Sequence, residues 1–123
     1  MSEKPVLERL QVKGARRLSV LHAPPDVDAA VGGGDRRATV ESAEVVLTFA
    51  RMRDELEARV AEAKDAMRPD AILWVAYAKK ASRLAGDIDR DVIWAYAQTV
   101  GLETVASIAI DADWSALRLK RAS

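Results

Sequence analysis

The sequence predicts an α/β fold with three layers, in which helices cover both faces of a mostly parallel sheet. The uninterrupted apolar run from Ala71 to Ala78 has the length of a strand, and such a run is typical of a strand that is covered on both faces. Residues 51–68 follow the period of an amphipathic helix, and strand-like and helix-like segments alternate along the chain. Because helical crossovers join parallel strands, this alternation favours a parallel sheet.

Composition restricts the class of protein. The chain has 123 residues, which suits a single domain with one core over residues 1–123. Half of the residues are hydrophobic and 31% are charged, as in an ordinary globular protein. The 19 basic and 19 acidic residues cancel, so no overall field favours binding to nucleic acid or to an anionic membrane. We therefore expect neither a nucleic-acid partner nor a membrane partner.

Three features of the sequence favour the cytoplasm. There is no cysteine, which excludes disulfides, cysteine catalysis and cysteine metal ligands, and fits a reducing compartment. The first residues are polar and lack the apolar segment of a signal peptide. No apolar run approaches the length of a transmembrane helix. We expect a cytoplasmic protein.

The first part of the chain predicts a short helix, a strand and a second short helix. Apolar residues spaced among charges predict the N-terminal helix within residues 1–14, and Leu18–His22 is rich in large aliphatic residues and forms the first strand. Pro24 and Pro25 end this strand, because neither residue has an N–H to donate to a strand ladder. Asp26 is then expected to cap the second short helix.

The next part of the chain contains the second strand and the longest helix. Residues 35–43 are ambiguous and hold at most a short edge strand. Glu44–Phe49 is largely apolar and rich in β-branched residues, and it forms the second strand. The helix over residues 51–68 has an apolar residue at every third or fourth position. Pro69 ends this helix, because the residue before a proline avoids the helical conformation.

The last part of the chain predicts a third helix and a terminal hairpin. Asp87 or Asp89 is expected to cap the helix, which ends at Gly101, a residue suited to that position. Residues 102–110 and 114–120 are rich in strand formers and surround a turn of sequence Asp-Ala-Asp. They therefore predict a C-terminal antiparallel hairpin.

The three tryptophans fall on different parts of the predicted fold. Trp74 lies in the central strand and is expected in the core, whereas Trp94 lies on a helix face that is expected to be partly exposed. Trp114 is expected to pack at the edge of the sheet. Because an exposed strand edge needs cover or pairing, the hairpin edge with Trp114 predicts a homodimer.

Two stretches resemble the class I methyltransferases. Residues 67–75, Met-Arg-Pro-Asp-Ala-Ile-Leu-Trp-Val, resemble the L-K-P-G-G-x-L junction that enters the fifth strand of these enzymes, and residues 104–121 resemble their last two strands. The resemblance implies a shortened Rossmann-like core. These enzymes bind S-adenosylmethionine at a glycine-rich turn after the first strand, but the turn here reads His22-Ala23-Pro24-Pro25-Asp26, and the three glycines at residues 32–34 come later. We expect no cofactor, and no binding of S-adenosylmethionine in the usual mode.

More closely, the chain resembles a family of short, uncharacterised bacterial domains. Their pattern is A-P-P after the first strand, W-V-x-W/Y-x-K-K-A-S at the central strand and W-S-x-L-K/R in the hairpin. This chain matches the pattern at residues 23–25, 74–82 and 114–118, and it departs from it at Ala78, where a proline is expected. The resemblance implies the fold over nearly the whole chain, and it brings no established activity.

The carboxyl ends of the predicted strands carry the candidate binding residues, because ligands of open parallel sheets bind there. The residues at this end combine three cations, an imidazole and two hydroxyls, which suit a phosphate or carboxylate group. We therefore predict an anionic small molecule as the ligand. The candidate ligand-binding residues are Pro24, Pro25, Thr48, Arg51, Lys79, Lys80 and Ser82, with His22 beside them.

His22 is the only histidine and the candidate for catalysis. A lone histidine at a strand end is more often hydrogen-bonded to a loop carbonyl than catalytic. The sequence has no G-x-S-x-G motif to supply a nucleophile. The acidic residues at 87–91 and 111–113 suit helix capping and a turn better than a metal site, so we expect no bound metal.

These observations favour a small cytoplasmic module for binding or protein interaction, without catalytic activity and assembled as a homodimer. The alternative is a small transferase, similar to a degenerate methyltransferase, that acts on or with an anionic molecule. In that case His22, Arg51, Lys79 and Lys80 would form its site. Loss of turnover in a His22 variant would separate the enzyme from the binding module.

Overall fold

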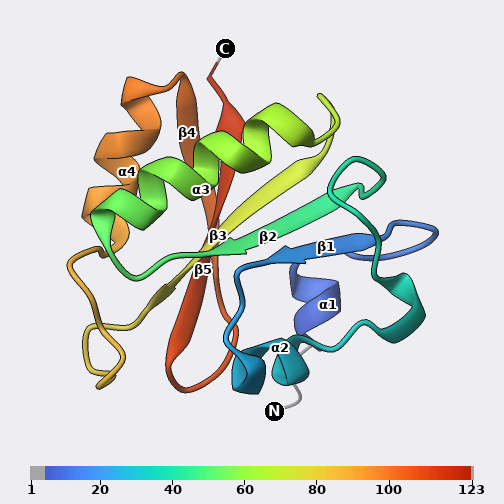
Figure 1. The fold of residues 1–123 in the computed structure, drawn as a ribbon, viewed down its shortest axis with the longest axis horizontal. Coiled ribbons are helices and arrows are strands. Elements are labelled where there is room, and N and C mark those ends of the chain that lie inside the picture. The colour runs from blue at the N-terminus through green and yellow to red at the C-terminus, as the bar shows by residue number, and fades with distance from the viewer. Residues whose placement is uncertain (1–4, 123) are drawn as a thin grey trace.

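A five-stranded sheet forms the centre of the fold (Figure 1). The computed structural model describes residues 5–122. The strand order is β1-β2-β3-β5-β4, in which β1, β2 and β3 are parallel and β5 runs antiparallel to both of its neighbours. The predicted α/β class, with parallel strands followed by an antiparallel C-terminal hairpin, is confirmed. The strands are β1 (Leu18–Leu21), β2 (Val45–Phe49), β3 (Ile72–Ala78), β4 (Leu102–Ala109) and β5 (Trp114–Arg121).

Helices cover both faces of the sheet, which gives the three layers that the sequence predicts. α3 and α4 pack on one face, and α1 and α2 pack on the other (Figure 1). Within residues 5–122, no helix is long and apolar enough to cross a membrane. The helices are α1 (Val6–Arg9), α2 (Pro25–Val31), α3 (Arg53–Ala66) and α4 (Arg90–Thr99), with a 3₁₀ turn, η1, at Gly34–Arg36.

The central strand β3 is buried on both faces, as its apolar run predicts. Successive side chains of a strand point to opposite faces, so Leu73, Val75 and Tyr77 join the core under α3 and α4. Trp74 and the alanines beside it join the second core, under α1 and α2. The Trp74 side chain is only 1% exposed, and its indole N–H donates to the Leu10 carbonyl oxygen at 3.0 Å. The prediction that Trp74 lies in the core is confirmed.

The prediction that Trp114 lies at the sheet edge is wrong. Its strand, β5, is inserted between β3 and β4, so the edge strand of the hairpin is β4. Trp114 is 3% exposed, and its ring meets the edge of the Phe49 ring with the centroids 5.1 Å apart. Trp94 is half-exposed on α4, as the sequence predicts. Pairing of the hairpin edge with another chain would therefore use β4 and not Trp114.

The structure also decides how the short helices begin. The predicted cap by Asp26 is wrong, because α2 begins at Pro25 with no side-chain cap. A proline fits the first position of a helix, where its missing N–H is not needed. Of the two predicted caps of α4, Asp89 accepts a hydrogen bond from the Val92 N–H, whereas Asp87 accepts one from the Arg53 N–H.

Residues 35–43 contribute one bridge residue to the sheet and not an edge strand. Arg37 forms an isolated parallel bridge with Leu18, and the N–H of Ala38 donates to the Leu18 carbonyl oxygen at 2.9 Å. The 3₁₀ turn η1 precedes this bridge, and Ala43 is buried at the approach to β2. The ambiguous segment therefore covers the outer side of β1 with loop structure.

Candidate functional site

The carboxyl ends of the parallel strands carry five of the eight predicted residues in two separate pockets. The first-strand pocket, of about 190 Å³, lies where β1 and β2 end, and the central-strand pocket, of about 350 Å³, lies where β3 ends. The first-strand pocket is lined by His22, Pro24, Phe49, Ala50, Arg51, Glu55, Arg59 and Trp114. The central-strand pocket is lined by Tyr77, Lys79, Lys80, Asp89, Arg90 and Asp91.

The cations of the first-strand pocket bind groups of the protein itself. The Arg51 Nε donates to the Leu84 carbonyl oxygen at 2.5 Å, and the Arg59 Nη1 donates to the Phe49 carbonyl oxygen at 2.9 Å. The second nitrogen of Arg59, Nη2, lies 3.5 Å from the Glu55 carboxylate. These contacts tie the loop after β3 and the first turns of α3 to the end of β2.

Glu55 is the acidic group of the first-strand pocket. Its carboxylate accepts hydrogen bonds from the N–H groups of Arg51 at 2.9 Å and Met52 at 3.2 Å, at the start of α3. The bond from the Arg51 N–H, with a smaller effect of the Met52 N–H and the Arg59 guanidinium, lowers the pKa of Glu55. Glu55 therefore carries a negative charge that opposes the cations around it.

His22 leaves the end of β1 with a left-handed backbone, at φ 63°. A residue with a side chain rarely takes this conformation, which is often found at functional sites. Its Nε2 lies 2.7 Å from the Oε1 of Glu62 on α3, so its partner is a carboxylate and not the loop carbonyl that the sequence favours. Both side chains are exposed at the surface of the protein.

The cations of the central-strand pocket are also engaged. The Lys79 Nζ donates to the Asp111 carbonyl oxygen at 2.8 Å, and the Lys80 Nζ lies 3.2 Å from the Asp89 carboxylate. The Val92 N–H, followed by Lys80, lowers the pKa of Asp89. The Ser82 hydroxyl donates to the Asp113 carboxylate at 2.8 Å, so it closes the loop onto the hairpin turn.

Three of the predicted residues, Thr48, Pro25 and Ser82, lie outside both pockets. Thr48 is fully buried within β2, and its hydroxyl oxygen has no hydrogen-bond partner among the described residues. Pro25 is exposed at the start of α2. The structure therefore brings together His22, Pro24 and Arg51, and separately Lys79 and Lys80.

The sequence pairs Glu55 with Arg59 along the helix, but sequence reasoning did not place Glu55 or Glu62 at the candidate site. Glu55 and Glu62 lie on α3, which follows β2 directly, so its first turns stand at the carboxyl end of the sheet. That order along the chain is the signal that could have placed them there. Among the residues that the structure describes, no group of three or more histidine or acidic side chains is placed to hold a metal ion.

A third hollow, the α4–β4 groove, lies at the other side of the hairpin. It encloses about 510 Å³ beside the edge strand β4, and Trp94 stands at it with half of its side chain exposed. Val105, on the same strand, is 44% exposed. The groove is lined by Arg90, Asp91, Trp94, Thr104, Ala106, Ser107 and Leu117.

Comparison with solved structures finds methyltransferases. The mitomycin 7-O-methyltransferase MmcR is 18% identical with a TM-score of 0.54, and the match covers 86% of this chain and 42% of that enzyme. The ribosomal protein L11 methylase from Lactobacillus delbrueckii subsp. bulgaricus is 9% identical with a TM-score of 0.58, and the match covers 96% of this chain and 76% of that enzyme. The CcbJ methyltransferase from Streptomyces caelestis is 13% identical with a TM-score of 0.57, and the match covers 96% of this chain and 88% of that enzyme.

These likenesses establish the fold, because the identities are low. They confirm the predicted resemblance to a shortened methyltransferase-like core, and the chain spans less than half of the first of these enzymes. No curated protein is similar to the chain in sequence. One family model, described as "Protein of unknown function (DUF3052)", matches residues 27–123.

Proposed function

We propose that this chain, which belongs to the family described as "Protein of unknown function (DUF3052)", is a small cytoplasmic, noncatalytic interaction module that pairs with a second copy of itself. The edge strand β4 carries the proposal. β4 is paired with β5 alone, and residues 104–109 of β4 read Thr-Val-Ala-Ser-Ile-Ala, with no charge. Proteins usually protect an exposed strand edge with charges, prolines or cover, so an uncharged edge favours pairing with another strand.

The edge strand suits pairing with its own copy. Two identical strands related by a twofold axis run antiparallel, and the uncharged stretch keeps like charges away from the axis. A register centred on Ala106 would place Glu103 opposite Ala109 of the second copy. The Arg9 guanidinium donates to the Ala109 carbonyl oxygen, so this register brings a carboxylate towards a guanidinium.

The α4–β4 groove supports the same arrangement. Pairing through β4 would extend the sheet into the second copy and set the two α4 helices on the same face of the joined sheet. Trp94, half-exposed on α4, would then stand beside the junction. Tryptophan is enriched in the buried centre of protein interfaces, where its large ring leaves water.

The carboxyl end of the sheet supports a role without catalysis. S-adenosylmethionine, which the fold implies, would have to approach the turn after β1, but Pro24 and Pro25 offer no N–H there. The residues present therefore do not fit this cofactor in its usual mode.

A second candidate function is a transferase at the same end of the sheet. The fold likeness to methyltransferases and the His22–Glu62 pair favour it, because an imidazole held by a carboxylate is a common general base. Stabilisation of the fold by S-adenosylmethionine in a thermal-shift assay, together with turnover that His22→Ala abolishes, would establish this function and displace the interaction module.

The oligomeric state tests the proposed function. Sedimentation velocity up to about 100 μM, where an interface of micromolar Kd is occupied, should show a dimer. Ala106→Lys, which adds a charge to the pairing edge, should leave a monomer. Ala61→Lys makes the same substitution at an exposed position of α3, and this variant should remain dimeric. A monomeric wild type, or a dimer that Ala106→Lys does not weaken, would refute the proposal.

A further inference from the structure

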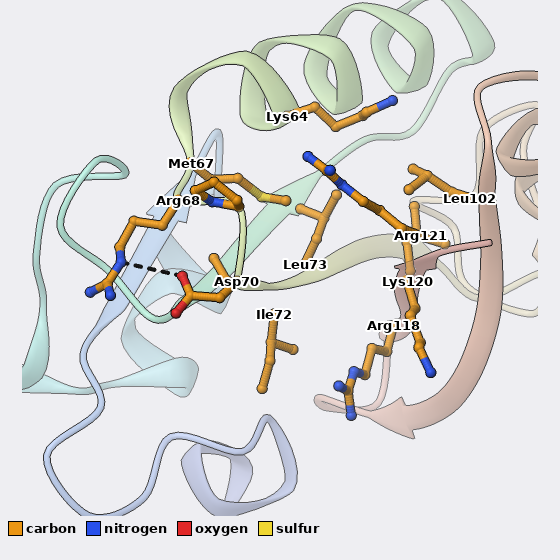
Figure 2. Close-up of a pocket in the computed structure, with 13 residues that line it drawn as sticks. Lys64, Met67, Arg68, Asp70, Ile72, Leu73, Leu102, Arg118, Lys120 and Arg121 are labelled. Carbon is orange, nitrogen blue, oxygen red and sulfur yellow. Dashed lines mark ion pairs between the residues drawn. The ribbon is translucent and has the colours of Figure 1, made fainter. Parts of the chain in front are cut away.

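The amino end of the parallel strands carries a group of basic side chains that the sequence did not single out. They line a hollow of about 240 Å³ where β3 begins and β5 ends, close to the end of α3 (Figure 2). Asp70 is the one carboxylate among the side chains that line this amino-end pocket. The basic side chains are Lys64, Arg68, Arg118, Lys120 and Arg121.

Two of the five cations are engaged by the protein. The Lys64 Nζ donates to the Val100 carbonyl oxygen at 3.0 Å. The Arg68 guanidinium lies 3.0 Å from the Glu44 carboxylate and 3.4 Å from that of Asp70, and Figure 2 shows Arg68 and Asp70 turned towards one another. These two cations therefore fix the connection between α3 and β3.

The other three cations, Arg118, Lys120 and Arg121, all come from β5, and they make no hydrogen bond or ion pair with any residue that the structure describes. Successive residues of a strand point to opposite faces. Arg118 and Lys120 share the face of Ala116, which joins the core under α1 and α2. Arg121 shares the face of Leu119, and Figure 2 shows it reaching towards the end of α3. Arg118 and Lys120 are therefore neighbours on one face of the sheet, and Arg121 stands apart from them.

Arg118 and Lys120 present their terminal nitrogens at the surface. Lys120 is exposed and Arg118 is half-buried. The nitrogen of Arg118 that is buried without a partner among the described residues is its Nε, whereas its two terminal nitrogens are not buried. A guanidinium can bind a carboxylate through its two terminal nitrogens, so the Nε need not take part. Both cations are therefore within reach of an acidic group from outside the protein.

The spacing of the two cations identifies the form of the partner. Arg118 and Lys120 are two residues apart on one strand, which sets their backbone positions about 7 Å apart. The side chains at alternate residues of an extended peptide have the same spacing and lie on one side of that peptide. An extended segment laid along β5, with a carboxylate at every second residue, would therefore bring one carboxylate to each cation.

The surroundings of the pair favour a peptide over a nucleic acid. Ala106 of β4, beside Arg118 in the strand register, is exposed and too small to block the face. Glu103 is the register partner of Lys120 and makes no ion pair with it, but it would repel a further negative charge. The chain as a whole has no net charge. Two carboxylates satisfy the two cations, whereas a nucleic acid would bring a longer run of phosphates to a face without further free cations.

We propose that the face of β5 that carries Arg118 and Lys120 binds an extended acidic segment of a partner protein, with carboxylates at alternate residues. The interaction uses the face of the sheet and not the edge of β4. It does not depend on the pairing of β4, so the failure of one proposal leaves the other intact.

Titration with two synthetic peptides of the same composition, followed by the amide chemical shifts in NMR spectra, tests the proposal. Both peptides have blocked ends, and the ionic strength is low, so that surface charges are little screened. Thr-Glu-Thr-Glu-Thr presents both carboxylates on one side of an extended chain, whereas Thr-Glu-Glu-Thr-Thr points them to opposite sides. The first peptide should bind saturably, and the second should bind about fivefold more weakly because it reaches only one of the two cations.

Variants of the two cations test where the peptide binds. Arg118→Gln with Lys120→Gln should lose about tenfold or more in affinity for Thr-Glu-Thr-Glu-Thr. Arg83→Gln with Arg121→Gln removes the same number of charges, one at the other end of the sheet and one on the other face of β5, and should bind as the wild type does. If the first double variant does not fold, Lys120→Gln alone changes an exposed side chain and should lose about threefold in affinity.

Several results would overturn the proposal. Equal binding of the two peptides, or an equal loss of affinity in the two double variants, would show attraction by general charge only. No saturable binding of Thr-Glu-Thr-Glu-Thr, or unchanged affinity in Lys120→Gln, would remove the site. Tighter binding of a short oligothymidylate with the same charge as the peptide would make the partner a nucleic acid and refute the assignment to a protein segment.

Discussion

The two ends of the parallel sheet both carry basic side chains, but they use them in opposite ways. At the carboxyl end, Arg51 and Lys79 donate to loop carbonyl oxygens, and Lys80 lies against the Asp89 carboxylate. At the amino end, the three cations of β5 have no such partner among the described residues. Open parallel sheets usually bind ligands at the carboxyl end, whereas the cations of β5 without internal partners among the described residues lie at the amino end.

The difference comes from the loops. Residues 79–89 and the turn at 111–113 meet at the carboxyl end, and their carbonyl and carboxylate oxygens accept from the nearby cations. At the amino end, the cations of β5 stand beside apolar side chains, and few acceptors reach them. A basic residue is therefore available to a ligand only where the fold leaves it without an internal acceptor.

Gly86 offers the strongest test of whether the carboxyl end is a packed structure and not an open site. A Cβ at this position would lie 1.9 Å from the Arg51 carbonyl oxygen, so the backbone of one loop would have to move. We expect Gly86→Ala to lower the free energy of unfolding by about 3 kcal/mol in urea denaturation. Ala81→Gly, at an exposed position of the same loop, should change it by no more than about 1 kcal/mol. If Gly86→Ala were as stable as the wild type, the carboxyl end would not be tightly packed, and the contrast between the two ends of the sheet would fail.

The two lysines after β3 sharpen the comparison. Lys79 donates to a backbone carbonyl across the loop, whereas Lys80 is 80% exposed and makes a surface ion pair. Lys79→Met should therefore lower the free energy of unfolding by about 1.5 kcal/mol or more, because it leaves the Asp111 carbonyl without its donor. Lys80→Met should cost only about 0.5 kcal/mol. If chemical denaturation gave the same free energy of unfolding for both variants, the Lys79–Asp111 hydrogen bond would not stabilise the hairpin turn. Lys79 would then again be a candidate ligand-binding residue.

Much of the fold could be predicted from the sequence because its signals are local. The apolar run of Ala71–Ala78, the period of α3 and the alternation of strands with helices each lie within one segment of the chain. The position of Trp114 could not be predicted in the same way. Chain order does not reveal that β5 passes between β3 and β4, and this insertion moves Trp114 from an edge into the core.

The site was less predictable, because its chemistry depends on partners that are distant in sequence. The sequence places Lys79 at the end of a strand, but its acceptor is the backbone carbonyl of Asp111. Every residue has such a carbonyl, so nothing in the sequence marks Asp111 as the partner of Lys79. Arg118 posed the opposite problem. It falls within a hairpin strand, where an arginine usually reaches solvent, and only the pairing with Trp74 and Ala106 buries its Nε.

The pH dependence of stability gives the smallest expected effect, and it tests whether Lys80 is neutralised. The Val92 N–H, followed by Lys80, lowers the pKa of Asp89 from its ordinary value of 3.8. The folded state thus binds this proton less readily than the unfolded state. The stabilising contribution of Asp89 is therefore complete above pH 3.8 and is lost as the pH falls through the lower pKa of the folded protein.

Asp89→Asn should reduce this loss, because asparagine can still cap α4 but does not titrate. Since the side chain is partly exposed, we expect the fall in the free energy of unfolding between about pH 5 and about pH 2 to shrink by about 0.5 kcal/mol or less. Asp91→Asn, at an exposed position two residues further along α4, is the control and should follow the wild type. If Asp89→Asn also followed the wild type, Asp89 would not be held in its charged form. Lys80 would then be as available to an anion as the cations of β5, and the contrast between the two ends of the sheet would rest on Arg51 and Lys79 alone.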